Sequence, residues 1–223
     1  MRLTIFSLLI ALFSACTFDF GKEGIVEGTM QYKINYLQDE TENPLIGLMP
    51  STLNMTFKNN TVLMEVEGWM GVFRSAFIKY GETGEAVTML KMMGKKYYYM
   101  SNGKSGYMGM SGYDSIVIQF DDKKKKILEY DCDHAMAKIP DSNIEFDIYY
   151  TRQIDIVNPN SQTPFSKING VLMEFQLDIN GIKMHLEAKE INEREIPDET
   201  FEIPDDYEEV PKSEIDEIFA SLV

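Results

Sequence analysis

The residue types best suited to nucleophilic or metal chemistry are scarce in this chain, which has two cysteines and two histidines in 223 residues. One of each lies in the tetrapeptide Asp131-Cys132-Asp133-His134. On a strand, Cys132 and His134 would share a face and could supply two zinc ligands. No second segment rich in cysteine or histidine completes a tetrahedral shell. We therefore expect a buried free cysteine and a half-buried histidine in the core, with no metal and no cofactor.

Other patterns associated with catalysis are incomplete. His185-Leu186-Glu187 matches the first half of a zinc deaminase signature, but the paired Cys-x-x-Cys is absent. Gly103-Lys104-Ser105-Gly106 lacks the strand-to-helix setting of a nucleophile elbow and is interpreted as a loop. The 36 acidic residues could supply a carboxylate pair, although no spacing selects one. We expect a protein that is not an enzyme, with a carboxylate-dependent hydrolase as the least favoured alternative.

The first cysteine, Cys16, follows an apolar run and two small residues. Met1-Arg2 gives a short positive start, and Leu3 to Phe13 is an apolar stretch too short to span a membrane, which needs about 20 residues. Phe13-Ser14-Ala15-Cys16 resembles a bacterial lipobox, in which the cysteine thiol receives a diacylglycerol before cleavage. The alternative is a plain secreted protein with an unrelated cysteine near the cut. We expect lipidation at Cys16.

The organisation that follows is a lipoprotein signal peptide over residues 1–15, a lipidated tether over 16–24 and one domain over 25–223. Thr17 follows the cysteine, so the aspartate that commonly retains lipoproteins in the inner membrane is missing. This predicts a cell-envelope protein anchored in the outer membrane, on either its periplasmic or its surface face. A diacylated cysteine gives stable anchoring, at about 0.8 kcal/mol per buried methylene.

The composition limits the possible partners. The formal net charge is −15, from 36 acidic and 21 basic residues, and such a chain would be repelled by nucleic acid and by anionic lipid surfaces. No nucleic-acid partner is expected. Membrane attachment would then depend on the N-terminal lipid, because no basic patch is available to provide it. With Cys16 lipidated, Cys132 has no disulfide partner, so the fold must depend on its core.

Alternating apolar and polar residues predict strands along most of the domain, about nine to eleven in number and antiparallel. Asn59-Asn60 and Asn180-Gly181 are hairpin turns of the kind that tolerates positive φ, and Gly94-Lys95 is a further turn. Asp121 to Lys126 is interpreted as a charged hairpin tip. The residues expected on the apolar face of the next strand are Leu128, Tyr130, Cys132, His134 and Met136. The fold class expected is mainly β: a single large curved antiparallel sheet, a half-barrel, with one or two short helices.

Two segments favour helix. Residues 44–52 could form a short turn or helix, and residues 212–222 carry an apolar stripe with Ser213 as a possible N-cap. One such helix cannot cover the apolar face of so wide a sheet, since a helix is about 10 Å across. The sheet must therefore curl on itself, pair with a second copy or hold something apolar. A closed barrel filled by its own side chains is the competing outcome.

The methionines bear on this question, because there are 15 and many fall on the predicted apolar faces. Methionine packs cores and also adapts to varied apolar ligands. If the face lines a cavity, the candidate lining residues are Met30, Tyr32, Met55, Met64, Tyr130, Met136, Phe146, Met173, Phe175 and Met184. Met173 and Met184 are predicted to be neighbours across the Asn180-Gly181 hairpin.

The second half of the chain carries a spaced pattern of residues after its lysine-rich turn. It consists of Ile127, Tyr130, Cys132 and Ala135, then Tyr150-Thr151 and Ile154, then Gly170, and finally Phe201, Ile203, Pro204 and Tyr207. This pattern resembles a group of bacterial envelope lipoproteins known only as domains of unknown function. Those proteins are similar in outline to the LolA/LolB lipoprotein carriers. The resemblance implies a curved half-barrel lined with apolar residues and plugged by short helices, and it implies no catalytic residues.

Two further functions stand beside the hydrolase. One is a carrier or sensor of a hydrophobic ligand, such as a lipid (a palmitate chain, for example) or a lipidated protein. The other is a module that docks on envelope proteins or glycans through the aromatic residues at Tyr97-Tyr98-Tyr99 and Tyr107. Binding of a hydrophobic ligand in the half-barrel cavity is the first expectation.

Overall fold

A computed structural model describes residues 24–39, 41, 44, 46–68, 71–102, 113, 115–140, 144–179 and 181–220. The predicted signal peptide, Cys16, nearly all of the tether and Tyr107 lie outside these residues. Within the described part of the chain, no helix has the length and apolarity needed to cross a bilayer.

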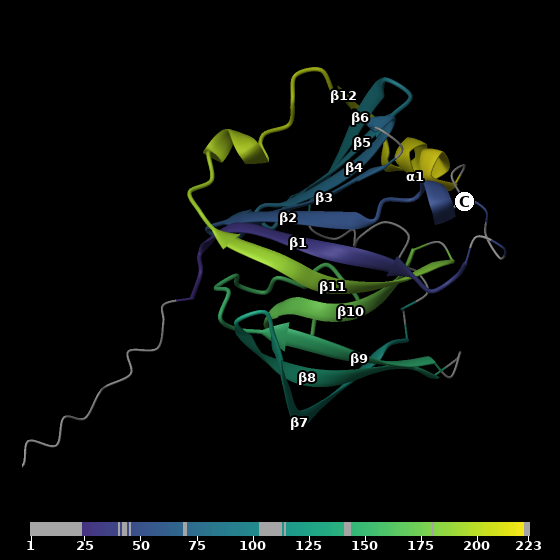
Figure 1. Ribbon diagram of the computed structural model, residues 1–223. Helices are drawn as coiled ribbons and strands as arrows, with labels where there is room; N and C mark the ends of the chain where they lie inside the picture. The colour runs from purple at the N-terminus through teal and green to yellow at the C-terminus, as the bar shows by residue number, and fades with distance from the viewer. Residues whose placement is uncertain are drawn as a thin grey trace, which may run out of the picture.

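The fold is mainly β, built on one large curved sheet of twelve strands, which confirms the predicted fold class (Figure 1). The strands are β1 (Glu27–Tyr36), β2 (Thr52–Lys58), β3 (Thr61–Gly68), β4 (Phe73–Lys79), β5 (Ala86–Met92), β6 (Lys95–Ser101), β7 (Val117–Ile127), β8 (Tyr130–Ile139), β9 (Ile144–Thr151), β10 (Val171–Ile179), β11 (Ile182–Glu193) and β12 (Glu208–Glu209). The helices are a 3-10 turn, η1 (Ile46–Leu48), a second, η5 (Asp198–Phe201), and one α-helix, α1 (Lys212–Ala220).

The sheet has two halves that meet at β1. Its strand order is β12-β6-β5-β4-β3-β2-β1-β11-β10-β9-β8-β7. The chain therefore runs from the centre to one edge, crosses to the other edge at β7, and returns to lie beside β1. All neighbours pair antiparallel except the two-residue β12, which pairs parallel with β6.

The hairpins follow the turn chemistry of the sequence. Asn59 and Asn60 both have positive φ, 46° and 70°, and join β2 to β3 as predicted. The turn between β5 and β6 is Met93-Gly94, one residue earlier than predicted, with φ of 50° and 85°. η1 and α1 confirm the two predicted helical segments. The helix begins at Lys212, so Ser213 lies in its first turn and is not the N-cap.

The prediction of a charged hairpin tip at residues 121–126 is wrong. These residues continue β7, and the turn lies at Leu128-Glu129, where Leu128 has a φ of 53° and is 41% exposed. The β7–β8 register shifts between Phe120 and Lys124. A bulge of this kind breaks the simple period-2 pattern, which explains why the sequence resembles a loop there.

The predicted apolar face of β8 is also wrong in part. Ala135 and Ala137, rather than His134 and Met136, belong to the main core. Ala135 pairs with Ile148 and Ala137 with Phe146 on β9. Cross-strand partners share a face, so the bulky residues of β9 determine which residues of β8 point inward.

The C-terminal segment wraps around the β6 edge of the sheet. Residues 194–207, here called the strap, pass over strands β3 to β6 on the outer face, where Ile196 and Phe201 are buried against Leu63, Ile78 and Val87. β12 then pairs with the edge of β6, and α1 packs on the inner face through the fully buried Ile215. Figure 1 shows η5 and α1 on opposite sides of the sheet.

Candidate ligand cavity

The inner face of the sheet contains a cavity of about 470 Å³. It extends from β5 in the first half of the sheet to β10 in the second half, and most of its wall is apolar. The strand residues on its wall are Tyr32, Ile34, Tyr36, Leu53, Met55, Val62, Met64, Glu65, Val66, Phe73, Ser75, Phe77, Thr88, Val171, Leu172, Phe175, Leu177, Ile179, Ile182 and Met184. Because β1 and β11 pair at the centre of the sheet, strands distant in sequence face one space.

Three non-strand segments complete the wall. Met49 and Pro50 follow η1, Asp216 and Phe219 come from α1, and the connection between β9 and β10 supplies Pro159, Asn160, Thr163 and Phe165. Buried Phe165 packs edge-to-face on Phe175, with ring centroids 6.0 Å apart. The Asn160 amide donates to the carbonyls of Ile168 and Gly170, at 2.8 and 2.9 Å, which holds this connection in place.

The two faces of strands β3 to β5 differ in how well they are covered. On the outer face, Leu63, Ile78 and Val87 are at most 5% exposed because the strap lies over them. On the inner face, Met64, Phe77 and Thr88 are only half-buried. The inner face of these strands is therefore less completely covered than the outer face, and the space beside it is the cavity.

Half of the candidate lining residues lie on this wall. Tyr32, Met55, Met64, Phe175 and Met184 line the cavity. Tyr32 also donates its hydroxyl to the carbonyl of Leu172 at 2.8 Å, which ties β1 to β10 across the sheet.

The other five candidates are placed elsewhere. Met30, Phe146 and Met173 are buried in the main core without lining the cavity, Tyr130 is half-buried against that core, and Met136 is half-buried on the other face of β8. At Met173 the cause is a register shift between Leu172 and Glu174 in the β9–β10 pairing. The shift brings Leu172 to the wall in place of Met173.

Several wall residues were not among the candidates. Phe73, Ser75 and Phe77 alternate along β4, and this period-2 pattern could have identified them. Phe165 lies in a connection without regular structure, and Phe219 comes from a helix whose docking position the sequence does not reveal. The sequence around these two aromatic residues contains no pattern that predicts their position on the cavity wall.

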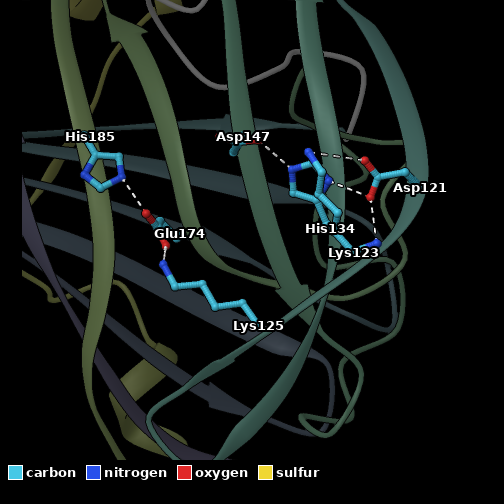
Figure 2. Close-up of polar contacts among 7 residues, drawn as sticks. All are labelled: Asp121, Lys123, Lys125, His134, Asp147, Glu174 and His185. Carbon is cyan, nitrogen blue, oxygen red and sulfur yellow. Dashed lines mark hydrogen bonds and ion pairs between the residues drawn. The ribbon is translucent and has the colours of Figure 1, made fainter.

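A separate polar network lies on the outer face of the second half of the sheet (Figure 2). The His134 side chain is 0% exposed, with Nδ1 2.8 Å from Asp121 and Nε2 2.7 Å from Asp147. Its ring also lies 4.9 Å from that of Tyr149. The backbone N–H of Lys123, together with His134, holds the pKa of the Asp121 carboxyl below its usual value. With no exposed surface, His134 cannot reach a substrate, so its role here is structural.

A second group beside it joins β7, β10 and β11. Glu174 accepts from His185 at 3.2 Å and also binds Lys125, whose ammonium group lies over the Tyr149 ring at 4.9 Å. Figure 2 shows both groups reaching across neighbouring strands. Among the described residues, no three side chains of the histidine, cysteine, aspartate or glutamate type are arranged to hold a metal ion.

Cys132 is buried and free, as predicted. Burial raises the pKa of its thiol from 9.0 to about 11, which keeps the thiol protonated at neutral pH. A protonated buried thiol is a poor nucleophile.

The predicted aromatic docking segment is partly covered by the protein itself. Tyr97 and Tyr99 pack in the cluster formed with α1, and Tyr98 packs in the cluster formed with the strap. All three tyrosines are half-buried. The three tyrosines therefore pack against other residues of this protein, and only part of each side chain is accessible to a docking partner.

The comparisons with known proteins give a fold likeness only. No protein-family model and no curated protein matches the chain. Solved structures of a protein named PNGF-II, in P21 and C2 crystal forms, match with TM-scores of 0.54 and 0.51 at 9% and 8% identity. Each match covers 88% of this chain and 33% of the PNGF-II chain, so this chain spans about a third of that length. The resemblance to envelope lipoproteins and the LolA/LolB outline stays a prediction.

Proposed function

We propose that this protein binds a hydrophobic ligand, a lipid or the acyl part of a lipidated protein, in the cavity on the inner face of its sheet. The observation that carries the proposal is the half-buried apolar wall at Met64 and Phe77, beside about 470 Å³ of space. Pockets that bind small molecules have volumes of roughly 300–1,000 Å³ and mostly apolar walls. The role proposed is binding or carriage, without catalysis.

The wall suits a flexible chain better than one rigid shape. Met49, Met55, Met64 and Met184 all contribute to it. Methionine side chains are unbranched and polarizable, so they can repack around ligands of different outline. Each methylene of an acyl chain transferred from water to this wall would contribute about 0.8 kcal/mol.

A direct test is to identify what the protein carries. The chain with Cys16→Ser, which cannot receive a lipid on that residue, would be purified without detergent, examined by native mass spectrometry and extracted with organic solvent. We expect an apolar molecule to copurify and to be released on unfolding. A ligand-free spectrum, together with no binding of an added uncharged fluorescent probe, would contradict the proposal.

We also propose that the protein is an outer-membrane lipoprotein anchored through Cys16. Support comes from the lipobox-like Phe13-Ser14-Ala15-Cys16 and from Thr17 after it. Intact-mass measurement of the wild type should show cleavage before Cys16 and the added mass of a diacylglycerol. Cys16→Ala should lose that mass and be released from membranes. A wild type without the lipid mass would refute the anchor and leave the cavity proposal standing.

A further inference from the structure

The few polar groups on the cavity wall differ in whether they can still form a hydrogen bond with a ligand. Asn160 uses its amide N–H groups on the carbonyls of Ile168 and Gly170. The Thr163 hydroxyl donates to the carbonyl of Asn160 at 2.9 Å. These donors serve the β9–β10 connection and are not available to a ligand.

The two acidic residues that border the cavity are already paired with cations. Glu65 lies on the same side of β3 as Leu63 and accepts from Arg74 Nη2 at 2.6 Å, beside Tyr207 of the strap. Asp216 forms an ion pair with Lys212 at 2.7 Å. Neither cation, nor any other lysine or arginine of the described residues, lines the cavity. A carboxylate or phosphate entering this space would lose its hydration without gaining a lysine or arginine partner from the described residues. Burial of an uncompensated charge is strongly unfavourable.

Two wall hydroxyls remain. Ser75 on β4 and Thr88 on β5 are half-buried, and both face the cavity. Ser75 pairs with Leu90 and Phe77 with Thr88, so Ser75 and Thr88 are diagonal neighbours on one face, with Cα atoms roughly 7–8 Å apart. Within the described part of the chain, neither side chain has a hydrogen-bond partner. Each hydroxyl can donate to a neutral oxygen such as an ester, alcohol or ketone.

We infer that the cavity selects an uncharged long-chain ligand that carries a neutral oxygen group, which accepts a hydrogen bond from Ser75 or Thr88, and that it discriminates against the same chain ending in a carboxylate. This inference deepens the proposed function and depends on it. An apolar body would occupy the wall formed by Met64, Phe77 and the strands beyond them. The neutral group would lie at β4 and β5, next to the strand surface on which α1 packs.

The test compares two ligands that differ only in their head group, 1-decanol and decanoate, by displacement of the uncharged probe N-phenyl-1-naphthylamine. The protein is the full chain with Cys16→Ser, at about pH 8, where decanoate is ionised. We expect 1-decanol to displace the probe at a concentration about tenfold or more below that of decanoate. In the double variant Ser75→Ala and Thr88→Val, 1-decanol should bind about five- to tenfold more weakly, while decane binds unchanged.

The control variant is Thr56→Val, which removes a half-buried hydroxyl of β2 that does not line the cavity. It should bind 1-decanol like the parent chain. Equal or tighter binding of decanoate would overturn this inference and leave the binding function intact, as would an unchanged 1-decanol affinity in the double variant. If no ligand displaces the probe because the probe itself does not bind, the proposed function fails as well.

Discussion

Leu177 on β10 and Met184 on β11 are direct cross-strand partners, and both line the cavity. The prediction that Met173 is the neighbour of Met184 is wrong, because the same register places Phe175 opposite Leu186 and leaves Met173 further along the strand. Partners on one face of an antiparallel pair have side chains about 5 Å apart. Enlarging both Leu177 and Met184 therefore adds volume at one place on the cavity wall.

We predict that Leu177→Trp combined with Met184→Trp fills the cavity and reduces binding of an uncharged fluorescent probe by at least tenfold. The new rings can enter existing space, so the loss of unfolding free energy should stay below about 3 kcal/mol. Probe titration and urea unfolding give the two measurements.

Met100→Trp is the control, because Met100 is 42% exposed and does not line the cavity. This variant should bind the probe like the parent. Met173→Trp gives a further contrast: its side chain is 0% exposed in the main core, so overpacking should destabilise the fold instead of blocking the cavity. Unchanged probe binding in the Leu177/Met184 double variant would argue against the cavity as the binding site.

The two histidines should differ sharply in their importance for stability. His134 contacts two carboxylates and is 0% exposed, whereas the His185 side chain is 26% exposed and contacts one. His134→Ala would leave Asp121 and Asp147 without their shared partner, at a cost of about 2–3 kcal/mol. His185→Ala should cost less than about 1 kcal/mol. Chemical denaturation of both variants tests the contrast, and similar losses would contradict it.

Cys132 provides a prediction on pH. Its folded-state pKa is about 11, above the ordinary value of 9.0, so its contribution to stability is complete below pH 9.0 and is lost as pH rises through about 11. In the Cys16→Ser chain, Cys132 is the only cysteine. We expect it to resist iodoacetamide at about pH 8–9 in the folded protein and to react readily in denaturant.

Cys132→Ala is the companion measurement. It should fold, retain probe binding and lose about 1–2 kcal/mol of stability, since it removes a small buried side chain. Rapid alkylation of the folded protein, or loss of probe binding in Cys132→Ala, would show that the thiol has a role beyond packing.

The sequence predicts the sheet well where one face is apolar and the turns are distinctive. β1, β2 and β9 to β11 have clear alternation, and Asn59-Asn60 fixes one hairpin through its positive φ. It fails where the register shifts, as between Phe120 and Lys124, because β7 has two more residues there than β8 and the regular alternation of the two faces is interrupted. The same effect replaces Met173 with Leu172 on the cavity wall.

The cavity itself depends on contacts that no local pattern encodes. β3 and β5 carry apolar residues on both faces, and the reason is visible only in three dimensions. The strap covers Leu63 and Val87 from outside, so Met64 and Thr88 are left facing the interior. Tertiary packing determines which segment of the chain covers each face of the sheet. The periodicity along one strand contains no information about this packing.

The helix α1 forms part of the cavity wall, and the last prediction is that it controls access to the cavity. Phe219 and Asp216 of α1 line the cavity, and Phe219 packs edge-to-face on Phe73 with ring centroids 6.3 Å apart. The helix is held by a small cluster around Ile215, separate from the main core.

Ile215→Ala should weaken the docking of α1 on the sheet by about 2–3 kcal/mol while the sheet stays folded. Stopped-flow measurements should then show probe association and dissociation both faster by about tenfold, with little change in affinity. Glu214→Gln, an exposed neighbour on the same helix, should leave both rates unchanged. Rates that stay at the parent values in Ile215→Ala would mean that ligands enter by another route and that α1 is a fixed part of the wall.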